Sequence, residues 1–356
     1  MARTADTDTA GRDTGRFDRI AAKAGGAIGA AASILATFLG LFAITFFIGR
    51  VLPIDPVLAI IGEEADAETY ARVARELGLD RPLVEQFLAY LGDVLRGDFG
   101  NARLTGNPVW SDLARAFPAT IELSTFAILI GTAVGIPLGV LAATNRGNAI
   151  DHISRFVMLL GYSTPVFWFG LIGLVVFYAW LGWVGGSGQL SLYNLDLVPR
   201  VTGFNTIDAA LAGDWAVFWD AINHLILPAS ILGYASVAFI GRMTRSFMIE
   251  QLPQEYIIAA RVKGLSRRTV VWRHAFRNIR VQLLTIVALA YGGLLEGTVL
   301  IESVFAWPGL GQYFTNALLV GDMNAVMAST LLIGAIFVGL NGLSDVLYRI
   351  FDPRTK

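Results

Sequence analysis

The chain contains the stretch Glu255-Tyr-Ile-Ile-Ala-Ala-Arg-Val-Lys-Gly264-Leu-Ser-Arg-Arg268. Residues 250–263 are rich in helix formers, which predicts a helix over this range. The small side chains of Ala259 and Ala260 allow another surface to approach closely. Gly264 lacks the Cβ atom that penalises positive φ, so it is a natural stop for this helix.

A second helix is predicted directly after this turn. The hydroxyl of Ser266 can accept a backbone N–H and cap the helix start, and the helix would run through Val270, Val271, His274 and Ala275. A basic loop that only orients the neighbouring membrane spans needs no capped turn. We therefore interpret the stretch as an ordered hairpin suited to a cleft in a protein partner, not to a nucleic acid.

The composition indicates a membrane protein. Of 356 residues, 55% are hydrophobic and 15% are charged, and the mean hydropathy is +0.59, whereas soluble domains average about 25% charged residues. The chain has no cysteine, which excludes disulfides and cysteine-based metal sites. Its only lysines are Lys23, Lys263 and Lys356, and none follows the glycine-rich pattern of a P-loop. The chain therefore has no recognisable P-loop for ATP.

Six apolar segments are long enough to cross a bilayer as helices, for which about 20 residues are needed. They lie near 28–49, 119–143, 156–181, 222–241, 282–302 and 324–347. The first uncharged run exceeds the 7–15 apolar residues, roughly, of a signal peptide, so we expect a retained span after a cytoplasmic tail at 1–27. The expected fold is an all-α, polytopic membrane protein with one integral domain over 28–352.

Basic residues set the expected orientation, because they favour the cytoplasmic side. The connection 242–281 is strongly basic, whereas 303–322 has no basic residue and 182–221 has Arg200 alone. Both termini, including the tail at 353–356, are therefore expected in the cytoplasm. The long loop 50–118 is expected outside.

That loop is expected to contain two short amphipathic helices. Tyr70, Val73 and Leu77 recur at helical spacing before Gly78, and a second apolar face runs from Pro82 to Gly97. Two interpretations stay open here: a lid packed on the outer ends of the spans, and a docking surface for a soluble partner.

The hairpin also carries a resemblance to a known family. Glu255-x-x-x-Ala259-Ala260-x-x-x-Gly264 resembles the EAA loop of bacterial ABC-importer permeases, and the chain is similar to the first permease subunit of the dipeptide, oligopeptide and nickel group. Further matching stretches are Arg96-Gly-Asp-Phe-Gly100, Pro118-Ala-Thr-Ile-Glu122-Leu, Ser163-Thr-Pro-Val-Phe-Trp168, His224-Leu-Ile-Leu-Pro-Ala229 and Glu302-Ser-Val-Phe-Ala-Trp-Pro-Gly-Leu-Gly311. One departure is Gln282, where the family usually has proline, so the start of the fifth span is expected to be straighter.

The resemblance implies a non-catalytic subunit that forms a peptide pathway across the bacterial cytoplasmic membrane. Implied partners are a second homologous permease, two P-loop ATPase subunits that bind ATP and Mg, an extracytoplasmic binding protein and membrane lipid. This chain itself would bind no cofactor or metal. Glu255, Ala259, Ala260, Gly264 and Leu265 are implied to couple it to the ATPase. Nickel chelates, glutathione and peptide antibiotics remain open as substrates.

Polar residues within the spans are candidate sites, because ionisable groups are costly there. Glu296 could face the passage and attract the ammonium end of a peptide, or could make a contact between helices. His224 is interpreted as a structural hydrogen bonder. Glu122 and Asp345 lie near span ends, where we expect water to reach them and their role to be anchoring.

Three other groups in or next to the spans have open or structural interpretations. Ser163, Thr164 and Trp168 flank a proline at the inner start of the third span, where either a gate or a plain kink would fit. The turn Trp307-Pro308-Gly309 is predicted to be rigid, and the family resemblance places it at the outer gate. Small residues in the second span, Gly131, Gly135 and Gly139, are expected to permit close helix packing.

Two other function classes compete with an ATP-driven importer. A self-contained channel or secondary transporter would need no capped hairpin and is often marked by an internal repeat, which this chain lacks. A membrane enzyme would need a catalytic pair within the spans. The chain has only His152, His224 and His274 and no His-Glu-x-x-His sequence.

Overall fold

The computed structural model describes residues 29, 32–47, 57–62, 66–76 and 78–351, with side chains up to residue 342. In this described part, helices joined by turns account for all regular structure, and the only β-type pairing is an isolated bridge between Asn101 and Pro108. The predicted tails at 1–27 and 353–356 lie outside the described residues.

The first half of the chain forms α2 (Leu58–Ile61), α3 (Ala67–Glu76), α4 (Leu83–Leu95), α5 (Val109–Thr144), α6 (Ala149–Ser163), α7 (Val166–Gly173) and the π-helical η1 (Leu174–Trp180). The second half forms η2 (Leu192–Asn194), α8 (Asn205–Ala212), α9 (Trp215–Gln251), α10 (Glu255–Val262), α11 (Arg267–Thr269), the π-helical η3 (Val270–Ala275), α12 (Phe276–Val304), α13 (Leu310–Leu319) and α14 (Met323–Phe351).

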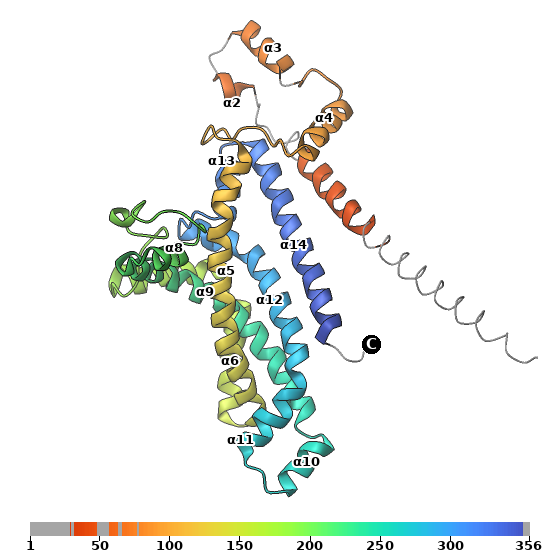
Figure 1. Ribbon diagram of the computed structural model, residues 1–356, viewed down its shortest axis with the longest axis vertical. Helices are drawn as coiled ribbons and strands as arrows, with labels where there is room; N and C mark the ends of the chain where they lie inside the picture. Colours follow the sequence, from red (N-terminus) through yellow and green to blue (C-terminus); the bar gives the residue numbers. More distant parts are fainter. Residues whose placement is uncertain (1–28, 30–31, 48–56, 63–65, 77, 352–356) are drawn as a thin grey trace, which may run out of the picture.

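The long helices α5, α12 and α14 run along the long axis of the molecule (Figure 1). Helices α10 and α11 lie at one end, and α2, α3, α4 and α13 lie at the other. Following the predicted orientation, these are termed the inner end and the outer end.

Among the described residues, four helices are long and apolar enough to span a membrane, and a fifth span results if α6 and α7–η1 are taken as one bent unit. The described part of the first predicted span is a shorter apolar helix over Ala32–Phe47. At about 1.5 Å per residue this part measures about 24 Å, less than the hydrocarbon core of about 30 Å. The number of six spans and the cytoplasmic position of both termini therefore remain predictions.

The helices extend beyond the predicted spans. The second predicted span starts at 119, but α5 begins at Val109, because Asp112 and Arg115 lower the local hydropathy without ending a helix. The prediction of one helix over 250–263 is wrong: α9 runs to Gln251, a turn follows, and α10 starts at Glu255. The hairpin's second helix continues without interruption into the fifth span, over Arg267–Val304.

The central contact of the fold is between α5 and α9, and it depends on the three glycines at small-residue spacing. A Cβ atom on Gly131 would lie 2.5 Å from the Cβ of Ser236, and one on Gly139 would lie 2.4 Å from the carbonyl oxygen of Gly241. Both distances are too short for any larger side chain. The prediction of close packing through this face is confirmed.

The third predicted span is broken at Pro165. Helix α6 ends at Ser163, α7 begins at Val166, and the two axes differ by 99°. Proline has no N–H and disfavours a helical conformation in the preceding residue, which explains the break. Arg245 of α9 fixes the inner end of α6 through two hydrogen bonds of 2.8 and 2.9 Å to the buried Asp151 carboxylate.

The two predicted helices of the outer loop are present as α3 and α4, and Gly78 and Gly97 follow them with φ of +65° and +81°. Aromatic rings join α4 to the first apolar helix: Phe42 lies 5.1 Å from both Phe87 and Tyr90. This packing supports the interpretation of a lid on the outer end of a span. The role as a docking surface stays a prediction.

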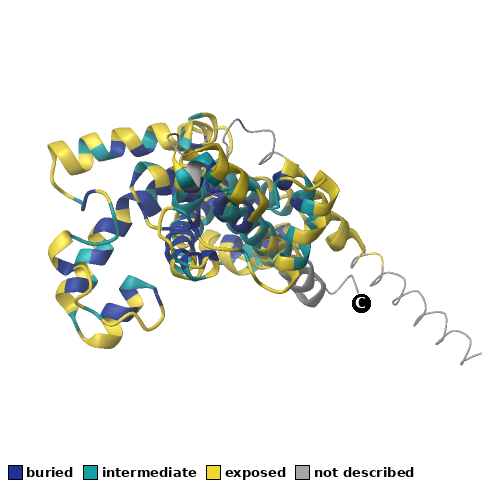
Figure 2. Cartoon of the chain, turned by 90° about the horizontal axis from the view of Figure 1, so that it is seen from above, coloured by how far each residue is buried: buried dark blue, intermediate teal, exposed yellow. Residues whose placement is uncertain are grey.

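Burial follows the same pattern in the view along the long axis (Figure 2). Buried residues concentrate where the helices meet, and exposed residues cover the outward faces. Many exposed residues are large and apolar, such as Leu129, Phe156 and Trp180, which are 59%, 61% and 76% exposed. Apolar surface of this extent is typical of a protein that contacts lipid or other membrane subunits.

The α5–α9 contact gives a first prediction. We expect Gly139→Ala to lower the free energy of unfolding by about 1–3 kcal/mol, because the added methyl overpacks the contact. The helix-propensity gain of about 1 kcal/mol from alanine applies to this variant and to the control alike. Gly293→Ala is the matched control, since a Cβ there meets nothing within 4 Å. Thermal unfolding of the purified chain in detergent measures the effect, and equal midpoints for both variants would contradict it.

Candidate coupling and gating sites

The hairpin at the inner end has the predicted turn chemistry. Gly264 follows α10 with φ of +76°, and its amide donates to the carbonyl of Arg261 at 2.9 Å. The hydroxyl of Ser266 accepts the amide of Thr269 at 3.3 Å and so caps α11. Both local predictions are confirmed.

The inner side of this hairpin is buried in a core of its own. Ile257 and Ala260 of α10 pack with Val270, Val271 and Ala275 of η3. This cluster also includes Val140 and Ala143 of α5, Met248 of α9, and Ile279 and Leu283 of α12. The hairpin is thus attached to the inner ends of three long helices.

The other side of the hairpin is exposed. Glu255 and Ala259 are exposed, whereas the neighbouring Ala260 is buried, so the two small residues have different surroundings. The expectation that both alanines admit an approaching surface holds for Ala259 only. Leu265 is 40% exposed.

A cleft adjoins this exposed side. Leu265 lines it together with Arg261 and Arg267, and its volume is about 430 Å³. Arg267 also donates to the carbonyl of Thr144 at the end of α5, at 2.6 Å. The cleft therefore lies between the hairpin turn and α5, to which the hairpin is hydrogen-bonded.

A single helix joins the hairpin to the outer end of the molecule. Arg267–Val304 has 38 residues, which corresponds to a length of about 57 Å. Helix α12 passes through Gln282 without a break, and the straighter start of the fifth span stays a prediction.

The outer end of this helix carries Glu302, which is fully buried. Its carboxylate accepts the amides of Gly311 and Gln312, at 2.6 and 3.1 Å, and the hydroxyl of Thr120 at 2.7 Å. The first two donors are free amides at the N-terminus of α13, where a negative charge is favoured. The same Thr120 hydroxyl accepts the amide of Leu310 at 2.7 Å.

The turn predicted to be rigid is enclosed by this network. Trp307 is 1% exposed, and its indole N–H donates to the carbonyl of Ala119 at 2.9 Å. A Cβ on Gly309 would lie 2.5 Å from the Glu302 carboxylate, so only glycine fits there. Pro308 is exposed at the surface. The expectation of an ordered turn is confirmed, and its rigidity and its role as a gate stay predictions.

A second buried carboxylate holds another outer helix. Glu122 of α5 is 2% exposed and accepts the amide of Thr206 at 3.0 Å and the hydroxyl of Thr206 at 2.5 Å, at the start of α8. The expectation that water reaches Glu122 is therefore wrong, although its anchoring role is supported. The other such carboxylate, Asp345, lies outside the residues whose side chains are described.

The outer loop that precedes α8 is ordered around Asp208. Burial alone would raise the pKa of Asp208, but hydrogen bonds from Thr202 and from the amides of Gly203 and Val201 outweigh it and hold the pKa below its ordinary value. His224 of α9 bonds to the carbonyl of Asp220, one turn earlier in the same helix, at 2.9 Å, which supports its structural interpretation.

The candidate passage residues lie apart from the hairpin. Glu296 is exposed on α12, and no described residue forms a hydrogen bond or ion pair with it. Ser163 ends α6 at the bend, Thr164 is half-buried there, and Trp168 of α7 is 48% exposed. The bend agrees with a kink, and a gating role stays a prediction.

The structural role of Glu302, which lies in one of the stretches similar to the family, was not predicted from the sequence, and neither was the role of Thr120. A usable signal was present: a carboxylate in the last turn of an apolar span precedes a Pro-Gly-Leu-Gly turn and a new helix start. Among the described residues, no group of three or more histidine, aspartate or glutamate side chains could hold a metal ion.

Comparisons with known proteins agree with this arrangement. The family described as binding-protein-dependent transport system inner membrane component matches residues 135–356, and the N-terminal part of such membrane components matches residues 28–124. The chain belongs to this family of transporter membrane subunits, the permeases of ABC importers.

Its relatives include permeases of peptide transport systems. The di/tripeptide transport system permease protein DppB of Pseudomonas aeruginosa is 41% identical over 324 residues, which cover 91% of this chain and 96% of the relative. The dipeptide transport system permease protein DppB of Escherichia coli is 40% identical over 325 residues, with the same coverage. A probable D,D-dipeptide permease of E. coli, DdpB, is 40% identical over 315 residues, 88% of this chain and 92% of the relative.

A solved structure shares the fold. The MetNI methionine ABC transporter, in inward-facing conformations, aligns with a TM-score of 0.51 and 18% identity, covering 67% of this chain and 95% of that chain. At this identity the likeness concerns the fold alone.

The Glu302 network gives a second prediction. Glu302→Gln places an amide NH₂ against backbone donors. We therefore expect the free energy of unfolding to fall by about 1–3 kcal/mol for each polar group left without a hydrogen-bond partner. Glu296→Gln is the matched control, the same change on the same helix at an exposed, unpaired side chain. Thermal unfolding of both purified variants tests this, and a destabilised control or a stable Glu302 variant would contradict the account.

Proposed function

We propose that this chain is a membrane subunit of an ATP-driven importer that carries di- and oligopeptides across the bacterial cytoplasmic membrane. The observation that carries the proposal is the capped hairpin, which is fixed to three spans on one side and exposed on the other. The family membership and the identities of about 40% to peptide permeases support peptides as the substrate class.

The partners follow from the same reasoning. Two P-loop ATPase subunits would bind ATP and Mg, and the exposed face with Glu255, Ala259, Gly264 and Leu265 would rest on one of them. Ala260 would act from within, by holding α10 on the spans. A second homologous permease would complete the passage, and an extracytoplasmic binding protein would deliver the peptide.

The passage would run beside the exposed face of α12. Glu296 would attract the peptide ammonium group, and Ser163, Thr164 and Trp168 would line the bend of the third span. The turn with Trp307, Pro308 and Gly309 would close the outer side. Nickel chelates, glutathione and peptide antibiotics are the alternative substrates.

The proposal predicts energy-dependent peptide uptake. In a bacterial strain that lacks its own dipeptide importers, the chain and its partner subunits are expected to restore uptake of radiolabelled Ala-Ala. A P-loop lysine-to-alanine change in the ATPase should abolish this uptake. Uptake that continues without hydrolysis would point to a self-contained transporter, and uptake of nickel but not Ala-Ala would identify the alternative substrate.

The hairpin turn gives a more specific prediction. Gly264→Val forces a β-branched residue into positive φ, at a cost of about 1–2 kcal/mol, and is expected to leave membrane insertion intact while abolishing peptide-stimulated ATP hydrolysis. Gly264→Asn is the matched control, because asparagine tolerates this conformation. Hydrolysis is measured in reconstituted complexes. Normal stimulation in the valine variant, or equal loss in both, would contradict the coupling role.

A further inference from the structure

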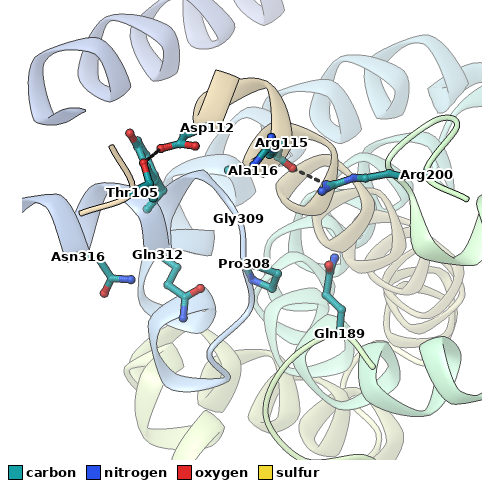
Figure 3. Close-up of a pocket in the computed structure, with 11 residues that line it drawn as sticks. Thr105, Asp112, Arg115, Ala116, Gln189, Arg200, Pro308, Gly309, Gln312 and Asn316 are labelled. Atoms are coloured by element: carbon teal, nitrogen blue, oxygen red, sulfur yellow. Dashed lines mark hydrogen bonds between the residues drawn. The ribbon is translucent and has the colours of Figure 1, made fainter. Parts of the chain in front are cut away.

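A polar pocket opens at the outer end of the molecule, next to the rigid turn (Figure 3). It lies between the start of α5, the loop that carries Gln189 and Arg200, the turn at Pro308 and Gly309, and α13. Its volume is about 240 Å³. Pockets for whole drug-sized ligands measure about 300–1,000 Å³, so this one has room for one end of such a ligand.

The pocket carries an excess of positive charge. Two arginines line it, Arg115 of α5 and Arg200, against one carboxylate, Asp112. Both oxygens of Asp112 already accept hydrogen bonds, from the Thr105 hydroxyl and, at 3.1 Å, from the amide nitrogen of Asn107. The Asp112 carboxylate is therefore already hydrogen-bonded to Thr105 and Asn107 and is not reserved for an ion pair with either arginine.

The arginines keep donor capacity for a ligand. Arg200 donates from Nη2 to the backbone carbonyl of Arg115 at 2.6 Å, and guanidinium has five N–H donors in total. The guanidinium of Arg115 has no hydrogen-bond or ion-pair partner among the described residues. In Figure 3 the Arg200 side chain extends to the carbonyl of Arg115 along a dashed line.

Two buried donors in the lining also have no acceptor. They are Nε2 of Gln189 and the hydroxyl of Tyr313. The carbonyl oxygen of the Gln189 side chain accepts from Asn205 at 3.0 Å, which fixes the opposite end of the amide as the free donor. In Figure 3 this amide extends toward Arg200. A buried donor without an acceptor is unfavourable, and a ligand oxygen would remove that cost.

We propose that this pocket binds a carboxylate group, and specifically the C-terminal carboxylate of a peptide that reaches the outer end of the passage. The two buried unpaired groups of the lining can both donate a hydrogen bond, and two further lining groups are guanidiniums, whose planar geometry matches a carboxylate. The choice of a peptide carboxylate over another oxyanion rests on the proposed function.

Ligand-detected NMR on the full chain in lipid nanodiscs tests the site without transport. The probe is N-acetyl-L-alanine, and N-acetyl-L-alanine amide is the uncharged comparison. We expect the acid to bind at least tenfold more tightly than the amide. Arg115→Gln and Arg200→Gln should each weaken binding of the acid at least fivefold. Tyr313→Phe, which keeps the ring, should weaken it severalfold.

Arg96→Gln is the matched control, because Arg96 is an exposed arginine of the outer segment whose side chain pairs with Asp93 at 3.5 Å, away from the pocket lining. Equal binding of acid and amide, or arginine variants that match this control, would overturn the proposal. So would binding of inorganic phosphate without binding of N-acetylalanine. If the arginines instead bind an acidic side chain of a binding protein, N-acetyl-L-alanine will not bind, and this outcome also overturns the proposal. Failure of peptide uptake, by contrast, would refute the proposed function and leave this result intact.

Discussion

A carboxylate buried at the outer end of a span is the constraint on which this structure depends. Glu302 cannot remain ionised in apolar surroundings without partners, and it finds them in the amides that begin α13 and in Thr120 of α5. Glu122 makes the equivalent attachment to the start of α8. Two helices, α13 and α8, are therefore fixed to the spans by hydrogen bonds from their N-terminal groups to buried carboxyl groups.

The same helix that ends at Glu302 begins in the hairpin, and this continuity links the two ends of the molecule. At the inner end the hairpin packs on α5 and α9 through its own core. Along their length, α5 and α9 are in close contact at glycines, where no side chain fits between the two helices. A push on the exposed face of the hairpin would thus move the outer turn as part of one body. In the proposed transporter, such a push would shift the passage only if the contacts between the ATPase and the hairpin differ between its two states.

The local parts of this architecture could be predicted from sequence. Gly264 and Ser266 specify a turn by their own chemistry, and the spacing of Gly131, Gly135 and Gly139 specifies a packing face. Contacts distant in sequence could not be predicted. Glu302 meets Thr120 across 182 residues, so only the fold reveals that the motif around Glu302 is a structural clamp. Hydropathy also missed the start of α5, since charged residues outside the bilayer can continue a helix. The polar pocket is likewise assembled from three separate segments.

The claim that the hairpin and the outer turn form one body is tested most directly by a distance between spin labels. The chain has no cysteine, and Val262 of α10 and Leu319 of α13 are 82% and 79% exposed, so labels can be placed at the two ends alone. Double electron–electron resonance is then recorded on the assembled transporter with and without a non-hydrolysable ATP analogue. The account predicts the same distance distribution within this chain in both states, while the distance from Val262 to the second permease changes. A nucleotide-dependent shift between Val262 and Leu319 would contradict it.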